Sequence, residues 1–360
     1  MRTFAVLVTA LAAVLCTGCA QLDYYLQAAQ GQIALMADAR PIDAWLADPA
    51  VAAKLKLRLA KAREIRRYAA EELALPDNAS YKNYADLKRP YVLWNIVAAP
   101  ELSMVAEQWC FPIAGCVNYR GYYDKQEAQN YAADLRRSGF DVQVSGVAAY
   151  STLGWFNDPV LSTFIQYPDG ELARLIFHEL AHQVAYAKND TQFNESFATA
   201  VEEVGVERWI ATQADPQTRQ KYIEFEGRKR DFVNLLLAYR HRLENNYARS
   251  VSDNDKRAEK VRIFQSLQSD YLQLKMSWGG YIGYDRWFAE PLSNAHLAAV
   301  AAYHDYVPAF RALLSQQKSL GNFYAAVKAM AALDPSARKA QLALLSRHAS
   351  LATMGTPAPQ

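Results

Sequence analysis

The chain has 360 residues, enough for one large domain or two with a substantial hydrophobic core. Hydrophobic residues make up 51% of it, including 22 tyrosines and 7 tryptophans, and this composition excludes a disordered protein. The formal net charge is only +2 and no basic run is interleaved with aromatic residues, so nucleic acid is not an expected partner.

Residues 1–18 have the pattern of an export signal rather than of folded structure. Arg2 supplies a positive charge, and residues 4–15 form an apolar run that is too short to span a membrane comfortably. The small residues that follow lead to Cys19, and the segment resembles the bacterial lipoprotein signal, in which cleavage precedes a cysteine that becomes lipidated. Cys16 stands at the −3 position, where that signal usually has Leu, Val or Ile. An ordinary cleaved secretory peptide is therefore the alternative.

A lipid anchor at Cys19 would place the protein in the cell envelope of a Gram-negative bacterium, facing the periplasm. Ala20 and Gln21 follow Cys19 with no aspartate, which resembles the outer-membrane version of the signal. In this oxidising compartment Cys110 and Cys116 are predicted to form a disulfide. Free thiols in a packed core are the alternative. A two-cysteine metal site is disfavoured because no further cysteine is available.

Residues 19–90 are predicted to form an N-terminal helical region. Apolar residues recur at every third or fourth position in 42–46 and 51–75, among many charged residues. Pro76-Asp77-Asn78 is expected to stop this helical run.

The part of the chain from 91 to about 164 is the only one rich in strand signals. Residues 91–97 and 141–147 are predicted strands because of their β-branched content and partial alternation. Residues 117–123 are a weaker strand candidate, and 125–138 a predicted helix between that candidate and the next strand.

A predicted buried helix over 172–187 carries the motif His178-Glu179-x-x-His182. Positions i and i+4 of a helix lie on one face about 6 Å apart, the spacing that two imidazoles need to bind one metal ion. Glu179 would then stand beside the metal site as a general base. A core helix with two hydrogen-bonded histidines is the alternative.

A catalytic zinc site needs a third protein ligand. The metzincin pattern would require Gly at 185 and His at 188, but the chain has Ala185 and Lys188. A carboxylate from the following helix is the remaining source. Four candidates lie there, and Glu195 is preferred because it stands in an apolar stretch, where a carboxylate is costly unless it is paired or coordinating.

The other three carboxylates receive different predictions. Asp190 is expected to cap a turn or the next helix. Glu202 lies two turns beyond Glu195 on the same face, so it is either the ligand or a partner for a histidine N–H. Glu203 is expected to face solvent. All four stay candidates for the third ligand at this point.

The rest of the chain is predicted to be helical. Residues 217–276 indicate two amphipathic helices broken near 250–255, followed by a loop at 277–283. Further helices are expected from 294 to 349, with a frayed tail at 351–360. These patterns predict an α+β fold that is predominantly α-helical, with one catalytic unit over 91–350.

Several segments together resemble the bacterial predicted-aminopeptidase lipoprotein family, and the two metal segments resemble the glutamate-zincin arrangement. The resemblance implies a zincin-like core with a small β-sheet before the metal helix. It also implies one Zn²⁺ per chain held by His178, His182 and Glu195, with Glu179 as general base. The matching segments, which span most of the mature chain, are 109–115, 119–122, 149–156, 158–159, the two metal segments, 284–287 and 294–296.

Other site residues are predicted because zinc peptidases need them. His296 and Tyr303 are candidate donors to the transition-state oxyanion, since this donor often comes from a later helix. An aminopeptidase also needs a carboxylate for the substrate amine, and Asp158 and Glu202 are candidates for it.

The leading functional hypothesis is a zinc-dependent peptidase, an aminopeptidase by resemblance, acting on peptide substrates in the periplasm. One alternative is a non-catalytic envelope-assembly or binding lipoprotein with a structural zinc site. Another is a zinc endopeptidase or a hydrolase of peptidoglycan stems. Apart from the membrane, reached through the Cys19 anchor, no protein partner is identifiable from the sequence.

Overall fold

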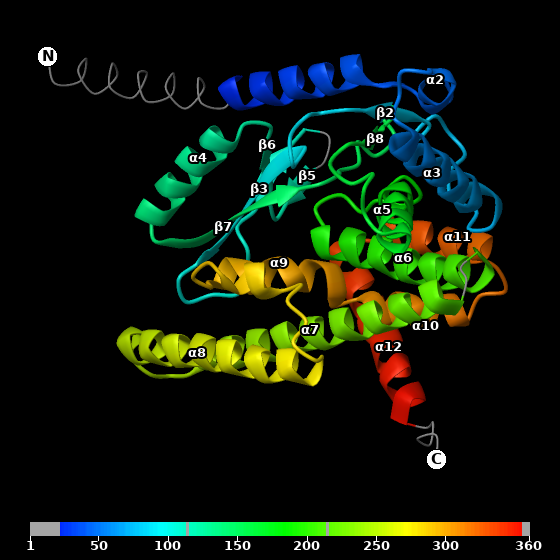
Figure 1. Ribbon diagram of the computed structural model, residues 1–360. Coiled ribbons are helices and arrows are strands. Elements are labelled where there is room, and N and C mark those ends of the chain that lie inside the picture. The colour runs from blue at the N-terminus through cyan, green and yellow to red at the C-terminus, as the bar shows by residue number, and fades with distance from the viewer. Residues whose placement is uncertain (1–21, 113–114, 214–215, 355–360) are drawn as a thin grey trace, which may run out of the picture.

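A computed structural model describes residues 22–112, 115–213 and 216–354, and Figure 1 shows their arrangement. Helices predominate and the strands form small sheets, in agreement with the predicted α+β class. The export signal, Cys19 and residues 355–360 lie outside the described residues. Within the described ranges, no helix is both long enough and apolar enough to cross a membrane.

The predicted N-terminal helices are present, and two short strands lie among them. A helix covers 22–38, and the helical run predicted to stop before Pro76 ends at Glu71. A small sheet of order β1-β2-β8 follows, with β2 antiparallel to β1 and parallel to β8. The elements are β1 (Arg40–Pro41), α2 (Ile42–Ala47), α3 (Ala53–Glu71), β2 (Asn83–Ala85) and β8 (Val160–Leu161).

The second sheet is antiparallel and has the order β6-β3-β7. The predicted strands 91–97 and 141–147 are confirmed as β3 and β7, and the predicted helix after them as α4. The weaker candidate over 117–123 is two strands, because β5 pairs with β4 in a separate hairpin and β6 pairs with β3. The bounds are β3 (Leu93–Pro100), β4 (Trp109–Phe111), β5 (Gly115–Val117), β6 (Arg120–Tyr122), α4 (Lys125–Arg137) and β7 (Phe140–Val147).

The buried centre of the molecule is an antiparallel pair of helices, α5 (Asp169–His182) and α6 (Thr191–Gln213). The prediction that the first helix runs to 187 is wrong, because α5 ends at His182. The turn that follows is held by Asn194, whose side chain accepts from Ala187 N at 2.7 Å and donates to Ala187 O at 2.9 Å. Fully buried aromatic rings pack around the pair, including Phe177 and Phe197.

The C-terminal half is helical, as predicted. The long hairpin of α7 and α8 breaks at 249–252, where Ser252 caps α8, and it lies along one side of the molecule in Figure 1. The last helix runs four residues into the segment predicted to fray. The elements are α7 (Pro216–Ala248), α8 (Asp253–Ser277), the 3-10 turn η1 (Asp285–Phe288), α9 (Asn294–His304), α10 (Val307–Ser315), α11 (Leu320–Ala331) and α12 (Pro335–Met354).

Candidate metal centre and active-site cavity

Three buried side chains converge between α5 and α6. His178 and His182 project from the last turn of α5, and Glu195 from the second turn of α6. Glu195 Oε2 lies 3.2 Å from His178 Nε2 and 3.5 Å from His182 Nε2, and the two nitrogens are 3.2 Å apart. Helical spacing brings the histidines together, and the turn after His182 returns the chain so that Glu195 faces them.

This group of atoms fits a divalent cation. Two imidazole nitrogens and one carboxylate oxygen, all within 4.8 Å of one another, are the donor set of catalytic zinc sites with two histidines and a glutamate. Burial would raise the pKa of Glu195, but the adjacent His182 and His178 lower it to about 2, so the carboxylate is ionised. An ionised carboxylate facing two imidazoles is the state required for metal binding.

Glu202 orients one of the two histidines. Its Oε2 lies 2.8 Å from His178 Nδ1, the contact that the two-turn spacing from Glu195 made available. Burial opposes ionisation of Glu202, but Lys229 and Arg174 hold its pKa well below the usual range. In contrast, Nδ1 of His182 is buried and has no hydrogen-bond partner among the described residues.

Arg174 anchors Glu202 and was missed in the sequence. It lies one turn before His178 on α5, is buried, and donates to Glu202 Oε1 at 2.9 Å. It also contacts Glu171 and Glu226, so three carboxylates share one guanidinium. A single arginine inside an otherwise apolar helix was the available signal, since a buried charge needs partners.

The metal group lines a cavity of about 380 Å³, and Glu179 lies in the same wall. Glu179 follows His178 on α5 and is buried, and desolvation raises the pKa of its carboxyl. The other walls come from the helix over 22–38, from the β6-β3-β7 sheet and from the loop over 148–157. The segment from Tyr150, predicted either to face substrate or to be a buried strand, is thus a loop in the cavity wall.

Three tyrosines surround the metal group. Tyr303 of α9 stacks on His178 with ring centroids 6.0 Å apart, and the negative charge of Glu195, followed by burial, raises the pKa of its hydroxyl well above the usual value. The residue is 38% exposed, so the charge of Glu195 is the more important cause. Burial, and then Glu195, raises the pKa of Tyr186 to about 12 and that of Tyr119 still further. All three therefore carry a proton at neutral pH.

His296 does not reach the cavity that His178 lines, and its prediction as an oxyanion donor is wrong. Its Nδ1 lies 3.2 Å from Ser293 N and 3.0 Å from Ser293 Oγ, forming the capping box at the start of α9. Its ring packs against Trp287 on the other side of that helix end. The sequence placed it on the correct helix but at the N-terminal end, two turns before Tyr303.

The two predicted anchors for a substrate amine are also wrong. Both carboxylate oxygens of Asp158 accept hydrogen bonds from Thr152, and its side chain does not line the metal cavity. Glu202 is fully engaged by His178, Arg174 and Lys229.

The remaining two carboxylates lie away from the metal group. Asp190 caps α6 through Phe193 N at 3.0 Å, as predicted, and pairs with Arg338. Glu203 was predicted to face solvent, but its side chain is only 23% exposed and pairs with Arg311. Neither approaches the two histidines.

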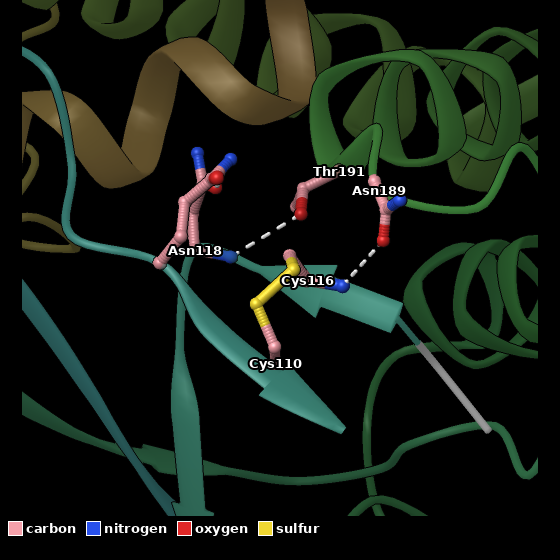
Figure 2. Close-up of a disulfide and its surroundings, with 6 residues drawn as sticks. Cys110, Cys116, Asn118, Asn189 and Thr191 are labelled. Carbon is pink, nitrogen blue, oxygen red and sulfur yellow. Dashed lines mark hydrogen bonds between the residues drawn. A yellow bond between two sulfur atoms is a disulfide. The ribbon is translucent and has the colours of Figure 1, made fainter. Parts of the chain in front are cut away.

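The disulfide between Cys110 and Cys116 staples the β4-β5 hairpin onto the turn between the metal helices (Figure 2). Asn189 Oδ1 accepts from Cys116 N at 2.7 Å, and Thr191 Oγ1 accepts from Asn118 N at 3.2 Å. The hairpin therefore supports the turn that brings Glu195 back to the histidines.

A family model described as "Putative aminopeptidase" matches residues 23–342. The chain belongs to this family. No curated protein and no solved structure matches it. The matched range includes every residue of the metal group and of the cavity wall.

Proposed function

We propose that this member of the "Putative aminopeptidase" family is a zinc-dependent peptidase with a zincin-like core. The observation that carries the proposal is the convergence of His178, His182 and Glu195 beside Glu179 in one cavity. Family membership supports a peptidase, and the donor set supports zinc as its metal. Bound zinc would polarise the scissile carbonyl and acidify the attacking water.

Glu179 would act as the general base and then as the general acid. It takes a proton from the attacking water and delivers it to the nitrogen of the leaving amine. Burial raises the pKa of its carboxyl, which makes the carboxylate a stronger base than an exposed glutamate. Its position in α5, directly after His178, fixes it to the wall that holds the metal ligands.

Tyr303 would donate to the oxyanion that develops at the carbonyl. Its hydroxyl stays protonated because the charge of Glu195 disfavours the phenolate. A neutral hydroxyl in a partly dehydrated cavity is an effective donor to a developing negative charge. Glu202 and Arg174 would act indirectly by holding His178 in one orientation.

We further propose that Cys19 carries the lipid anchor and that the protein acts in the periplasm, at the outer membrane. The export pattern of residues 1–18 supports this location. The Cys110–Cys116 disulfide supports an oxidising compartment. Labelling cells with a palmitate analogue, for the wild type and for Cys19→Ser, tests the anchor. Equal labelling of both proteins would contradict it.

Cleavage of a mixed peptide library by the purified mature protein tests the activity. We expect cleavage that a chelator abolishes and zinc restores, with products shortened from the N-terminus. Matched peptides with free and acetylated N-termini separate the two modes of cleavage, because an aminopeptidase needs the free amine. Cleavage of both forms at internal bonds would show an endopeptidase, and no cleavage at all would contradict a peptidase.

A further inference from the structure

Two polar atoms in the wall of the metal cavity lack hydrogen-bond partners. They are Gln32 Nε2, on the helix over 22–38, and Asn95 Oδ1, on β3. Both atoms are buried, and neither has a partner among the described residues. A buried amide atom without a partner costs free energy, so a site that pays it at two adjoining wall positions points to a ligand with matching groups.

The amide of Gln32 is held at its oxygen. Gln32 Oε1 accepts from the hydroxyl of Tyr123 at 3.0 Å and from that of Tyr150, and the two hydroxyl oxygens are 2.5 Å apart. Because both hydroxyls lie at the oxygen, the amide nitrogen is the atom left to donate elsewhere.

The oxygen of Asn95 is kept accessible from the sheet. Asn95 lies between Gly121 of β6 and Ser145 of β7 in register, and Gly121 also lines the cavity. A Cβ at Gly121 would stand 3.2 Å from Asn95 Oδ1, closer than an ordinary contact. The glycine therefore leaves the space beside this oxygen to a ligand.

We propose that Gln32 and Asn95 form a subsite that binds one peptide group of the substrate, away from the scissile bond. Gln32 Nε2 donates to its carbonyl oxygen and Asn95 Oδ1 accepts from its N–H. This assignment rests on the proposed peptidase function. One peptide group supplies the acceptor and the donor that these two atoms require.

The subsite selects an uncharged group rather than the substrate's amine. Among the described residues that line the cavity, only Glu179 and Glu195 are acidic, and both belong to the metal site. A buried ammonium facing a neutral amide would be poorly compensated. The substrate class is therefore peptides of three or more residues, because a dipeptide has only the scissile peptide group.

Kinetics of Gln32→Leu and Asn95→Leu on a tetrapeptide and on a dipeptide test the subsite. We expect KM for the tetrapeptide to rise about tenfold, the effect of one lost hydrogen bond, with kcat within about twofold. The dipeptide should be cleaved equally by wild type and variants. Gln30→Leu is the matched control, because Gln30 is exposed on the same helix. Variants that resemble this control on both substrates would overturn the proposal.

Tetrapeptides with single ester replacements of peptide N–H groups locate the contact. One replacement should weaken the wild type about tenfold but leave Asn95→Leu unchanged. If instead acetylation of the N-terminus has this pattern, Asn95 binds the amine and the proposal is wrong. Gln32→Glu keeps an oxygen for the two tyrosines while removing the donor, so it replaces Gln32→Leu if that variant does not fold.

Peptide binding to the Glu179→Gln protein separates this inference from the proposed function. Calorimetry should show the tetrapeptide bound about tenfold more weakly once Gln32→Leu is added, even without turnover. Binding that is unaffected would overturn the subsite whether or not the protein is a peptidase. Failure of the wild type to cleave any peptide would overturn the proposed function instead.

Discussion

His178 Nδ1 lies 2.8 Å from Glu202 Oε2, and this contact joins a metal-facing imidazole to a buried network of charges. The same carboxylate receives Arg174 at 2.9 Å and Lys229 at 3.5 Å. One His178 nitrogen therefore faces the metal group while the other is fixed by α6. This arrangement sets the orientation and tautomer of the ring.

Loss of the Glu202 charge should weaken metal binding without removing a ligand. For Glu202→Gln we expect zinc affinity to fall about 10- to 100-fold, the usual effect of losing a partner that orients a ligand. Competition with a chromogenic chelator measures it. Glu203→Gln is the control, because this neighbour pairs with Arg311 instead. Equal zinc affinity of Glu202→Gln and the wild type would contradict the orienting role.

Tyr303→Phe should lower kcat and leave KM nearly unchanged, because an oxyanion donor acts in the transition state. The expected loss is about 10²- to 10³-fold. Tyr119→Phe and Tyr186→Phe provide comparators from the same cavity. A larger loss for either of them than for Tyr303→Phe would reassign the donor.

Gly115→Ala should disturb the hairpin that supports the turn between the metal helices. Gly115 has φ +75°, and a Cβ there would stand 2.4 Å from Asn189 Oδ1 and 2.6 Å from Lys188 Cγ. We expect a loss of stability of about 1–3 kcal/mol from backbone strain, plus the cost of this clash. Gly139→Ala is the control, since φ is +86° but nothing lies within 4 Å. Equal denaturation midpoints for the two variants would contradict the close contact.

His296 should make the fold sensitive to acid. Burial, opposed by nearby Asp141, lowers the pKa of His296 from 6.5 to about 4, so below pH 6.5 the unfolded chain binds a proton that the folded chain resists. Its contribution is fully present above pH 6.5 and is lost as pH falls to 4, by roughly 3 kcal/mol.

His296→Gln should flatten this part of the pH profile while keeping the capping box, because glutamine is favoured at that position and does not titrate. His304 has a similarly lowered pKa, so part of the acid sensitivity should persist in the variant. Urea denaturation of both proteins between pH 4 and pH 8 measures the difference. Parallel profiles would show that His296 does not titrate with folding.

The placement of His178 and His182 could be predicted because it depends only on helical spacing. Glu195 was also within reach, since a carboxylate in an apolar helix needs a reason to be there. The end of α5 was not, because no glycine or proline marks it and the stop depends on Asn194 binding the backbone of Ala187. Such a side-chain contact exists only after the helices have packed.

Residues of the cavity wall outside α5 and α6 could not be placed from sequence. Gln32 and Asn95 are 63 positions apart and meet the same cavity only because the helix over 22–38 packs on the β6-β3-β7 sheet. Tyr24 fixes that packing, since its ring stacks on Phe111 and lies 3.8 Å from the Arg120 guanidinium carbon. Local periodicity contains no information about such contacts.

The most direct test of the central claim compares zinc content and peptide turnover in the wild type, Glu179→Gln and Glu195→Ala. We expect Glu179→Gln to keep one zinc per chain and lose about 10²- to 10⁴-fold in kcat, because only the general base is removed. Glu195→Ala should lose both the metal and the activity. Full turnover by zinc-loaded Glu179→Gln would contradict the assignment of Glu179 and with it the proposed chemistry.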